Sequence, residues 1–304
     1  MEQTFMKEKK ILPLVLSMSL PMMLSMLVNS LYNIVDSYFV AQISEQAMTA
    51  LSLVYPLQLL ETAIAVGFGI GMNAAAAYYL GAKEQQRADD IVTSGLILSL
   101  LHGVILMAAA LLFAPAFVSL FTENEKILAE GVKYSNLVFI FAVPNVIAIT
   151  FEKIFQAEGR MKVSMLSMLC GCVANIILDP LLIFGIGIFP KMGIEGAAIA
   201  TGIGQVIPLI VYLFIFIKHP VSLHFHWHEK VFQKRLMGQM YGVGIPATLN
   251  LALPSFMITA LNGILAVYSA SYVLVLGIYY KLQTFIYLSA NGIVQGIRPI
   301  ISYN

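Results

Sequence analysis

Residues 27–41 read LVNSLYNIVDSYFVA and residues 172–185 read CVANIILDPLLIFG, so each of two long apolar segments contains an aspartate. Asp36 lies in the first segment and Asp179 in the second. A carboxylate at the centre of a membrane helix costs roughly 2.5–3.5 kcal/mol on insertion scales, and such acids are typically functional. The two segments therefore predict membrane helices that handle protons or cations.

The composition supports a membrane protein. Hydrophobic residues make up 59% of the chain, charged residues make up 11%, and the mean hydropathy is +0.85. Soluble domains contain about 25% charged residues. We expect an all-α integral membrane protein, a polytopic helix bundle, with eight spans at about 12–40, 50–80, 91–114, 128–157, 163–189, 193–217, 239–268 and 272–303.

Lysine and arginine predict the orientation of these spans. With the N-terminus in the cytoplasm, twelve of these residues lie in cytoplasmic segments and three lie on the opposite side. This bias follows the positive-inside rule. We therefore expect a multi-pass protein with a cytoplasmic N-terminus, and the basic residues give no indication of nucleic-acid binding.

The sequence contains an internal repeat with a shift of 225 positions. Pro21 aligns with Pro246, and the second span aligns with the last through identical residues: Leu51, Tyr55, Leu57, Gln58, Ala65, Gly67, Gly71 and Tyr78 match Leu276, Tyr280, Leu282, Gln283, Ala290, Gly292, Gly296 and Tyr303. A unit of six spans is even, so both copies enter the membrane in the same sense. We expect small-residue contacts between helices at the repeated glycines.

The repeat predicts the domain organisation. Residues 1–218 would form a six-helix N-terminal lobe, 219–238 a cytoplasmic linker between lobes, and 239–304 the first two helices of a second lobe. Two complete units would need about 450 residues (twice the 225-residue shift), so we expect the last four helices to be missing. The small-residue faces around Gly292 and Gly296 are then expected to lack packing partners.

The polar residues of the first segment lie on one side of the helix. Asn29, Asn33 and Asp36 are spaced i, i+4 and i+7, and Asn175 and Asp179 repeat the i, i+4 spacing. Two carboxylates with amide oxygens nearby can bind Na⁺, or can take up a proton if they are desolvated. The same oxygen ligands serve both ions, so the choice between H⁺ and Na⁺ stays open.

Other charged residues within the spans give weaker indications. Glu61 suits an interfacial position and a functional one equally. Glu152 and Lys153 are expected to extend toward the cytoplasmic interface. Arg298 is expected to reach the same interface, with a position at the cavity as the alternative.

The histidines of HFHWHEK alternate, which suggests a metal site at His224, His226 and His228. The neighbouring Phe225 and Trp227 favour an amphipathic stretch at the membrane interface instead. We therefore expect no metal site. The sequence contains no arrangement typical of catalysis, such as HExxH or GxSxG, and the chain is not expected to be an enzyme.

The sequence resembles the multidrug and toxic compound extrusion (MATE) family, in its bacterial DinF-like and MepA-like branch. The resemblance rests on SLPMMLSMLVNSLYNIVDSYFVA, GIGMNAAAAYYLGAKEQQRA, FQAEGRMK, NIILDPLLIFG, GIEGAAIATGIGQ and GIVQGIRPIISYN, and it covers nearly the whole chain. Members have twelve helices in two lobes around a central cavity. They export amphipathic, often cationic, compounds in exchange for protons or sodium, and no other cofactor is expected.

The resemblance also implies site residues. Positions matching Asp36, Asn175, Asp179 and Thr201 line a cation-sensitive pocket in the first lobe, and Asn33 lies on the same helix as the first aspartate. For the substrate cavity, we add five candidates: Asn29, Tyr32, Gln58, Gln283 and Arg298. The expected partners are small-molecule drugs or organic cations and the lipid bilayer of a bacterial inner membrane, without an obligate protein partner.

Two alternatives remain. A lipid-linked oligosaccharide flippase of the same superfamily would need a basic cavity to hold pyrophosphate, and only Lys281 and Arg298 would supply it. An inactive truncated membrane fragment is the other alternative. We expect the 304 residues alone to insert into a membrane but not to export drugs.

Overall fold

The computed structural model describes residues 5–226 and 231–304, without the side chains of residues 281, 284–286, 288 and 289. The described residues form ten helices and no strand. The helices are α1 (Phe5–Glu8), α2 (Ile11–Ala41), α3 (Glu45–Gly81), α4 (Gln85–Ser119), α5 (Glu125–Ile140), α6 (Ala142–Ala157), α7 (Met161–Phe184), α8 (Ile194–Lys218), α9 (Lys234–Ala266) and α10 (Ala270–Tyr303).

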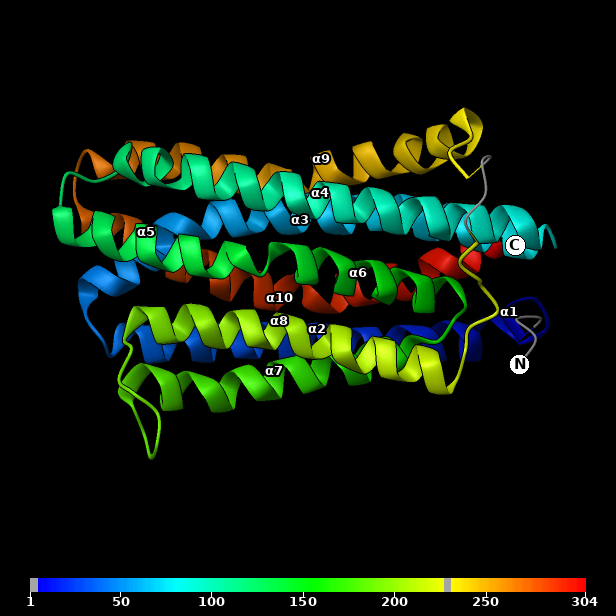
Figure 1. Ribbon diagram of the computed structural model, residues 1–304, viewed down its shortest axis with the longest axis horizontal. Helices are drawn as coiled ribbons and strands as arrows, with labels where there is room; N and C mark the ends of the chain where they lie inside the picture. The colour runs from blue at the N-terminus through cyan, green and yellow to red at the C-terminus, as the bar shows by residue number, and fades with distance from the viewer. Residues whose placement is uncertain (1–4, 227–230) are drawn as a thin grey trace.

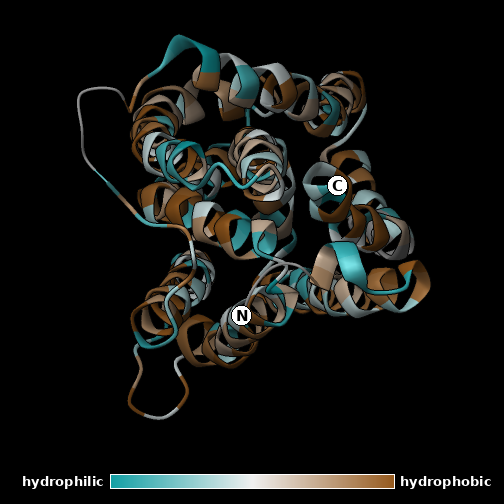
Figure 2. Ribbon diagram, turned by 90° about the vertical axis from the view of Figure 1, so that its right-hand side faces the viewer, coloured by the Kyte–Doolittle hydropathy of each residue, from teal (hydrophilic) through white to brown (hydrophobic). Residues whose placement is uncertain are grey.

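The long helices run side by side, and successive ones reverse direction except α5 and α6, which continue in one direction (Figure 1). Both termini lie at one end of the bundle, together with the turns at 82–84 and 158–160 and the segment that follows α8. We call this the terminal end. Hydrophobic residues are frequent along the helices (Figure 2). Many of them are exposed on the outside, including Ile105, Phe113 and Phe214 at 54%, 67% and 60% exposure. An exposed apolar surface around satisfied helices suits lipid.

The helices agree closely with the predicted spans. Among the described residues, six helices are long and apolar enough to cross a membrane, and the bent pair α5 and α6 makes a seventh. The eighth predicted span corresponds to α10, of which residues 270–280 form the apolar stretch within the residues searched. The all-helical membrane fold expected from the sequence is therefore confirmed.

The bend between α5 and α6 has a local cause. The two helices meet at Phe141 with an angle of 48°. Pro144 has no N–H to bond to the carbonyl of Ile140, and its ring would clash with that carbonyl in a continuous helix. The predicted span 128–157 is therefore one polypeptide segment with a break near its middle.

The repeated glycines bring the two halves of the chain together. A Cβ at Gly67 would lie 2.6 Å from Thr248 Cα of α9, and one at Gly292 would lie 2.6 Å from Met23 Cα of α2. Subtracting 225 from 248 gives 23, so the two contacts are copies of each other. Gly71 with Gly244 and Gly296 with Ser19 form a second such pair, with separations of 2.8 and 2.7 Å from the backbone nitrogens.

These contacts confirm that the glycines permit close helix packing. They also correct one expectation, because Gly292 and Gly296 do not lack partners: both are buried against α2. The expectation rested on packing partners from later helices of the second lobe. The structure instead packs α9 on α3 and α10 on α2.

Candidate functional site

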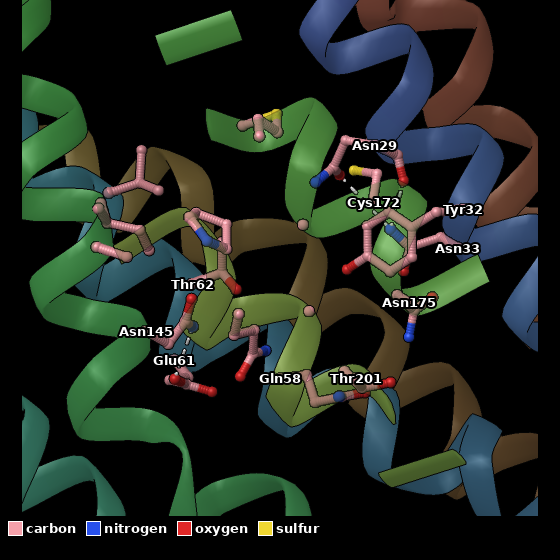
Figure 3. A pocket seen from close by; sticks show the side chains of 18 of the residues that line it. Asn29, Tyr32, Asn33, Gln58, Glu61, Thr62, Asn145, Cys172, Asn175 and Thr201 are labelled. Atoms are coloured by element: carbon pink, nitrogen blue, oxygen red, sulfur yellow. Dashed lines mark hydrogen bonds between the residues drawn. The ribbon is translucent and has the colours of Figure 1, made fainter. Parts of the chain in front are cut away.

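A cavity of about 330 Å³ lies inside the bundle between α2, α3, α5, α6, α7, α8 and α10 (Figure 3). Its lining is rich in amides, hydroxyls and acids. The polar and charged lining residues are Asn29, Tyr32, Asn33, Asp36, Tyr55, Gln58, Glu61, Thr62, Tyr134, Asn145, Glu152, Lys153, Asn175, Thr201, Gln205, Tyr212 and Gln295. Ligand sites are commonly concave with a few convergent polar groups, so this cavity is the candidate site.

The two membrane aspartates approach each other across the α2–α7 interface. Asp36 and Asp179 are 5% and 0% exposed, and their charges are close enough to interact. Asp36 lines the cavity, whereas Asp179 lies behind Asn175 and outside the set of described lining residues. No ion pair to Asp179 occurs among the residues that the structure describes. Two neighbouring carboxylates favour the uptake of a proton or a cation from solution here.

Asn175 connects Asp179 to the cavity. With its amide oriented to satisfy both ends, it donates to Asp179 Oδ2 at 3.2 Å and accepts from the backbone N–H of Thr201 at 3.2 Å. Helices α7 and α8 are thus joined at the level of the acid. A carboxylate fixed by an amide keeps an orientation in which its remaining lone pairs can accept a proton or a cation.

The polar side of α2 faces the same cavity. Asn29, Tyr32 and Asn33 line it (Figure 3). Asp36 lines it as well. The Asn33 Nδ2 donates to the backbone oxygen of Asn29 at 2.8 Å. The i, i+4, i+7 spacing therefore produces one continuous polar stripe.

The remaining cavity candidates divide into two groups. Gln58 lines the cavity and donates to the hydroxyl of Tyr134 at 3.4 Å, and Thr201 lines it from α8. Gln283 and Arg298 are not among the described lining residues. Both are half-buried on α10, and Lys281 has an undescribed side chain.

A second acid lies on the other side of the cavity. Glu61 of α3 is 6% exposed and accepts a hydrogen bond from Asn145 Nδ2 of α6 at 3.1 Å (Figure 3). Both residues line the cavity, so Glu61 faces the inside of the bundle and not the membrane–water interface. Sequence reasoning missed Asn145, although its position directly after Pro144, at the start of α6, marks the place where the helix turns toward α3.

Glu152 and Lys153 correct another expectation. They do not extend to the interface: they are 7% and 2% exposed and pair with each other, Lys153 Nζ lying 2.9 Å from Glu152 Oε1. Gln156 accepts from Lys153 Nζ at 3.1 Å and donates to Glu152 Oε1 at 2.5 Å. The prediction that both side chains extend to the cytoplasmic interface is wrong, because these partners replace the water that would otherwise solvate the two charges.

The charge of the lining follows from these pairs. The described lining residues include three carboxylates, Asp36, Glu61 and Glu152, and one ammonium, Lys153, which is paired to the third carboxylate. The described lining therefore carries two more acidic groups than basic ones. Such a low-dielectric cavity attracts cations and repels anions.

Comparison with known proteins places this geometry in context. A family model described as MatE matches residues 21–181, just over half of the chain. The multidrug export protein MepA of Staphylococcus aureus (strain MRSA252) is 28% identical over an alignment that covers 100% of this chain and 67% of MepA.

Solved structures of MATE transporters are also similar to this chain. The structure of the MATE multidrug transporter DinF-BH superposes with a TM-score of 0.89 at 27% identity, covering 98% of this chain and 67% of that one. An outward-facing MATE family transporter, 23% identical, superposes with a TM-score of 0.83 over 94% of this chain and 63% of that one, and shows the fold alone. The chain thus spans about two thirds of the length of the relatives that it matches.

Proposed function

Because the chain belongs to the MatE family of multidrug efflux transporters, we propose that it forms the cation-coupling part of a secondary antiporter. The antiporter exports amphipathic cationic compounds in exchange for H⁺ or Na⁺. The observation that supports this proposal most is the buried cavity, which Asp36 and Glu61 both line. Glu61 accepts a hydrogen bond from Asn145, and no described basic residue forms an ion pair with it.

The substrate class follows from the charge and the lining. Two acids on opposite sides and several aromatic rings, including Tyr32, Tyr134 and Tyr212, offer a cation both electrostatic attraction and ring faces. A cavity of about 330 Å³ is at the lower end of the range for drug-sized ligands, which suits a compact or partly inserted aromatic cation.

Coupling would occur at Asp36 and Asp179, with Asn175, Asn33 and Thr201 supplying further oxygens. A proton or Na⁺ bound here neutralises the charge that a cationic substrate needs, so the two ligands favour different states. An inward gradient of the coupling ion then drives the substrate outward, since each ligand shifts the equilibrium by its differential affinity. Antiport at this pair requires no other cofactor.

The flippase alternative has less support. An anionic pyrophosphate needs unpaired basic groups, and the basic residue among the described lining residues, Lys153, is bound to Glu152. Arg298 is not among those lining residues. A cationic substrate fits the described cavity better.

We place the protein in a bacterial inner membrane with its N-terminus in the cytoplasm. Residues 1–218 would form the N-terminal lobe and residues 239–304 the first two helices of the second lobe, with 219–238 as the cytoplasmic linker between them. The paired glycine contacts between α3 and α9 and between α2 and α10 support this division, because they relate the two parts by the repeat.

Dye binding to the reconstituted chain tests the coupling site. We would measure the affinity of purified chain in nanodiscs for a fluorescent lipophilic cation across pH and Na⁺ concentration. Wild type should lose affinity, by about tenfold or more, as the coupling ion saturates its site. Asp36→Asn and Asp179→Asn should remove this dependence, and Glu123→Gln, at an exposed loop acid, should retain it.

A second measurement connects binding to export. In a version of the chain completed to the length of its relatives, Asp36→Asn should raise drug accumulation in cells at equal expression. Undiminished ion dependence in Asp36→Asn, or undiminished export, would remove this aspartate from the mechanism.

A further inference from the structure

The segment between α8 and α9 forms an extended strap, residues 219–226, along the terminal end of the bundle. Its side chains alternate between buried and exposed positions. Val221 and Leu223 are buried, and the ring of Phe225 packs against Phe151 and Phe216 with centroid separations of 6.1 and 5.5 Å. His224 and His226 point to the other side and are exposed. Alternation with a period of two is the geometry of extended chain.

This finding changes the interpretation of the histidines. The sequence suggested an interfacial stretch held by aromatic residues, but Phe225 contacts the protein core. Trp227 and His228 lie outside the described residues. The histidines are therefore displayed by a segment that the core and α4 hold in place, and their positions are defined by the fold.

Helix α4 holds the strap through three residues one helical turn apart. Gln85 Nε2 donates to the Ser222 oxygen at 2.7 Å, Asp89 Oδ1 accepts from the His224 N–H at 2.9 Å, and Thr93 Oγ1 accepts from the His226 N–H at 3.2 Å. The spacing i, i+4, i+8 places these anchors in one row along the helix. The backbone of both histidines is thereby fixed to α4.

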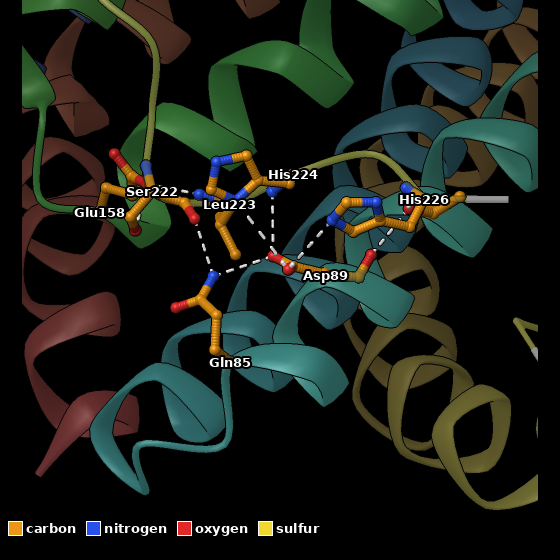
Figure 4. A network of polar contacts seen from close by, with 8 residues as sticks. Gln85, Asp89, Glu158, Ser222, Leu223, His224 and His226 are labelled. Carbon is orange, nitrogen blue, oxygen red and sulfur yellow. Dashed lines mark hydrogen bonds and ion pairs between the residues drawn. The ribbon is translucent and has the colours of Figure 1, made fainter.

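Asp89 also faces the two imidazole rings (Figure 4). Its Oδ2 lies 4.0 Å from His224 Nδ1 and 3.9 Å from His226 Nε2, and the three ligand atoms all lie within 4.8 Å of one another. These separations are too long for direct hydrogen bonds. The carboxylate, which is 4% exposed, and the two nitrogens thus surround a small common space.

We propose that Asp89, His224 and His226 form a binding site for a transition-metal cation of the Zn²⁺ class, which fastens the strap to α4. Zinc binds imidazole nitrogen at about 2.0–2.1 Å and carboxylate oxygen at about 2.0–2.2 Å in tetrahedral geometry. Ligand atoms are then about 3.3–3.5 Å apart. Closing from the observed separations needs only small rotations of two exposed rings.

The surroundings of Asp89 support a ligand role. Gln85 Nε2 donates to Asp89 Oδ1 at 2.9 Å, and the same oxygen accepts from His224 N–H, so Oδ2 is left to face the rings. A metal-binding carboxylate is typically oriented by such outer hydrogen bonds. Two imidazoles and one carboxylate match Zn²⁺ better than Mg²⁺ or Ca²⁺, which prefer oxygen ligands.

Metal binding would be measured on the full chain purified without a histidine tag. Co²⁺ serves as the spectroscopic probe, since its visible absorption reports tetrahedral coordination, and Zn²⁺ is then added as competitor. We expect one saturable site per chain, from which Zn²⁺ displaces Co²⁺. His224→Gln and His226→Gln should each weaken binding by about tenfold or more.

His219→Gln is the matched control. His219 is an exposed histidine of the same strap that lies outside the cluster, and its substitution should leave the affinity unchanged. Neither ring substitution removes the backbone hydrogen bonds that hold the strap, so thermal unfolding without metal should be the same for all variants. The proposal fails if Co²⁺ binding does not saturate, if the double variant His224→Gln/His226→Gln binds like wild type, or if His219→Gln weakens binding equally.

Discussion

The buried pair Glu152–Lys153 gives a quantitative prediction about stability. Lys153→Met keeps an unbranched apolar stem, which in Lys153 packs over Gly69, and removes the ammonium group. Removing one partner of a buried ion pair costs about 3–5 kcal/mol because the other charge is left buried. Gln156 still donates to Glu152 Oε1, so we expect a cost near the lower limit, about 3 kcal/mol.

The double variant Glu152→Gln/Lys153→Met isolates the cause. It leaves no charge at positions 152 and 153, and a glutamine at 152 can still exchange hydrogen bonds with Gln156. Replacing a whole buried pair is often neutral, so the double variant should lie within about 1 kcal/mol of wild type. The free energy of unfolding would be measured by SDS titration in mixed micelles, followed by far-UV circular dichroism.

An exposed ion pair supplies the control. Arg87 pairs with Glu84 at the terminal end with side chains 44% and 43% exposed, and Arg87→Met should cost at most about 1 kcal/mol. The reasoning is refuted if Lys153→Met costs no more than Arg87→Met. It is also refuted if the double variant is as unstable as the single one.

Two further predictions concern the repeat. Gly67→Ala and Gly292→Ala should each destabilise the chain by about 1–3 kcal/mol in the same unfolding assay, because each new Cβ would meet a neighbouring backbone Cα at 2.6 Å. Gly242→Ala is the control and should be neutral or stabilising, because open space surrounds this glycine. Equal effects at all three positions would contradict the close packing of the helices. Residues 1–304 alone, in energised vesicles, should show no gradient-dependent efflux of an ethidium-type dye. Alternating access moves one helix bundle against another, and the relatives are about one and a half times as long as this chain. Efflux above that of empty vesicles would contradict this prediction.

Hydropathy and spacing were sufficient to predict the helices and the placement of the first acid. A helix in lipid must satisfy its own backbone, so apolar length alone predicts the spans. The α-helical period then placed Asn29, Asn33 and Asp36 on one side of α2, and all three line the cavity. These properties are local, which is why one sequence is enough to predict them.

Contacts between distant segments could not be predicted in this way. Glu61 and Asn145 are 84 residues apart, and the strap meets Asp89 about 135 residues away in sequence. The outward expectation for Lys153 failed for the same reason: its backbone oxygen accepts from Asn73 of α3, a contact that fixes its helix deep in the bundle. Of these features, only the bend between α5 and α6, which turns α6 toward α3, has a local sequence signal, namely Pro144.

The paired glycine contacts have a consequence for the origin of the fold. Gly67 meets Thr248 while Gly292 meets Met23, so each half offers the other the same two surfaces. This is the arrangement of an isologous interface, in which residue i contacts j and j contacts i. A chain of one repeat carries both surfaces, so two separate copies of it would form the same contacts as a twofold homodimer. Gene fusion would then preserve an existing interface without having to create a new one.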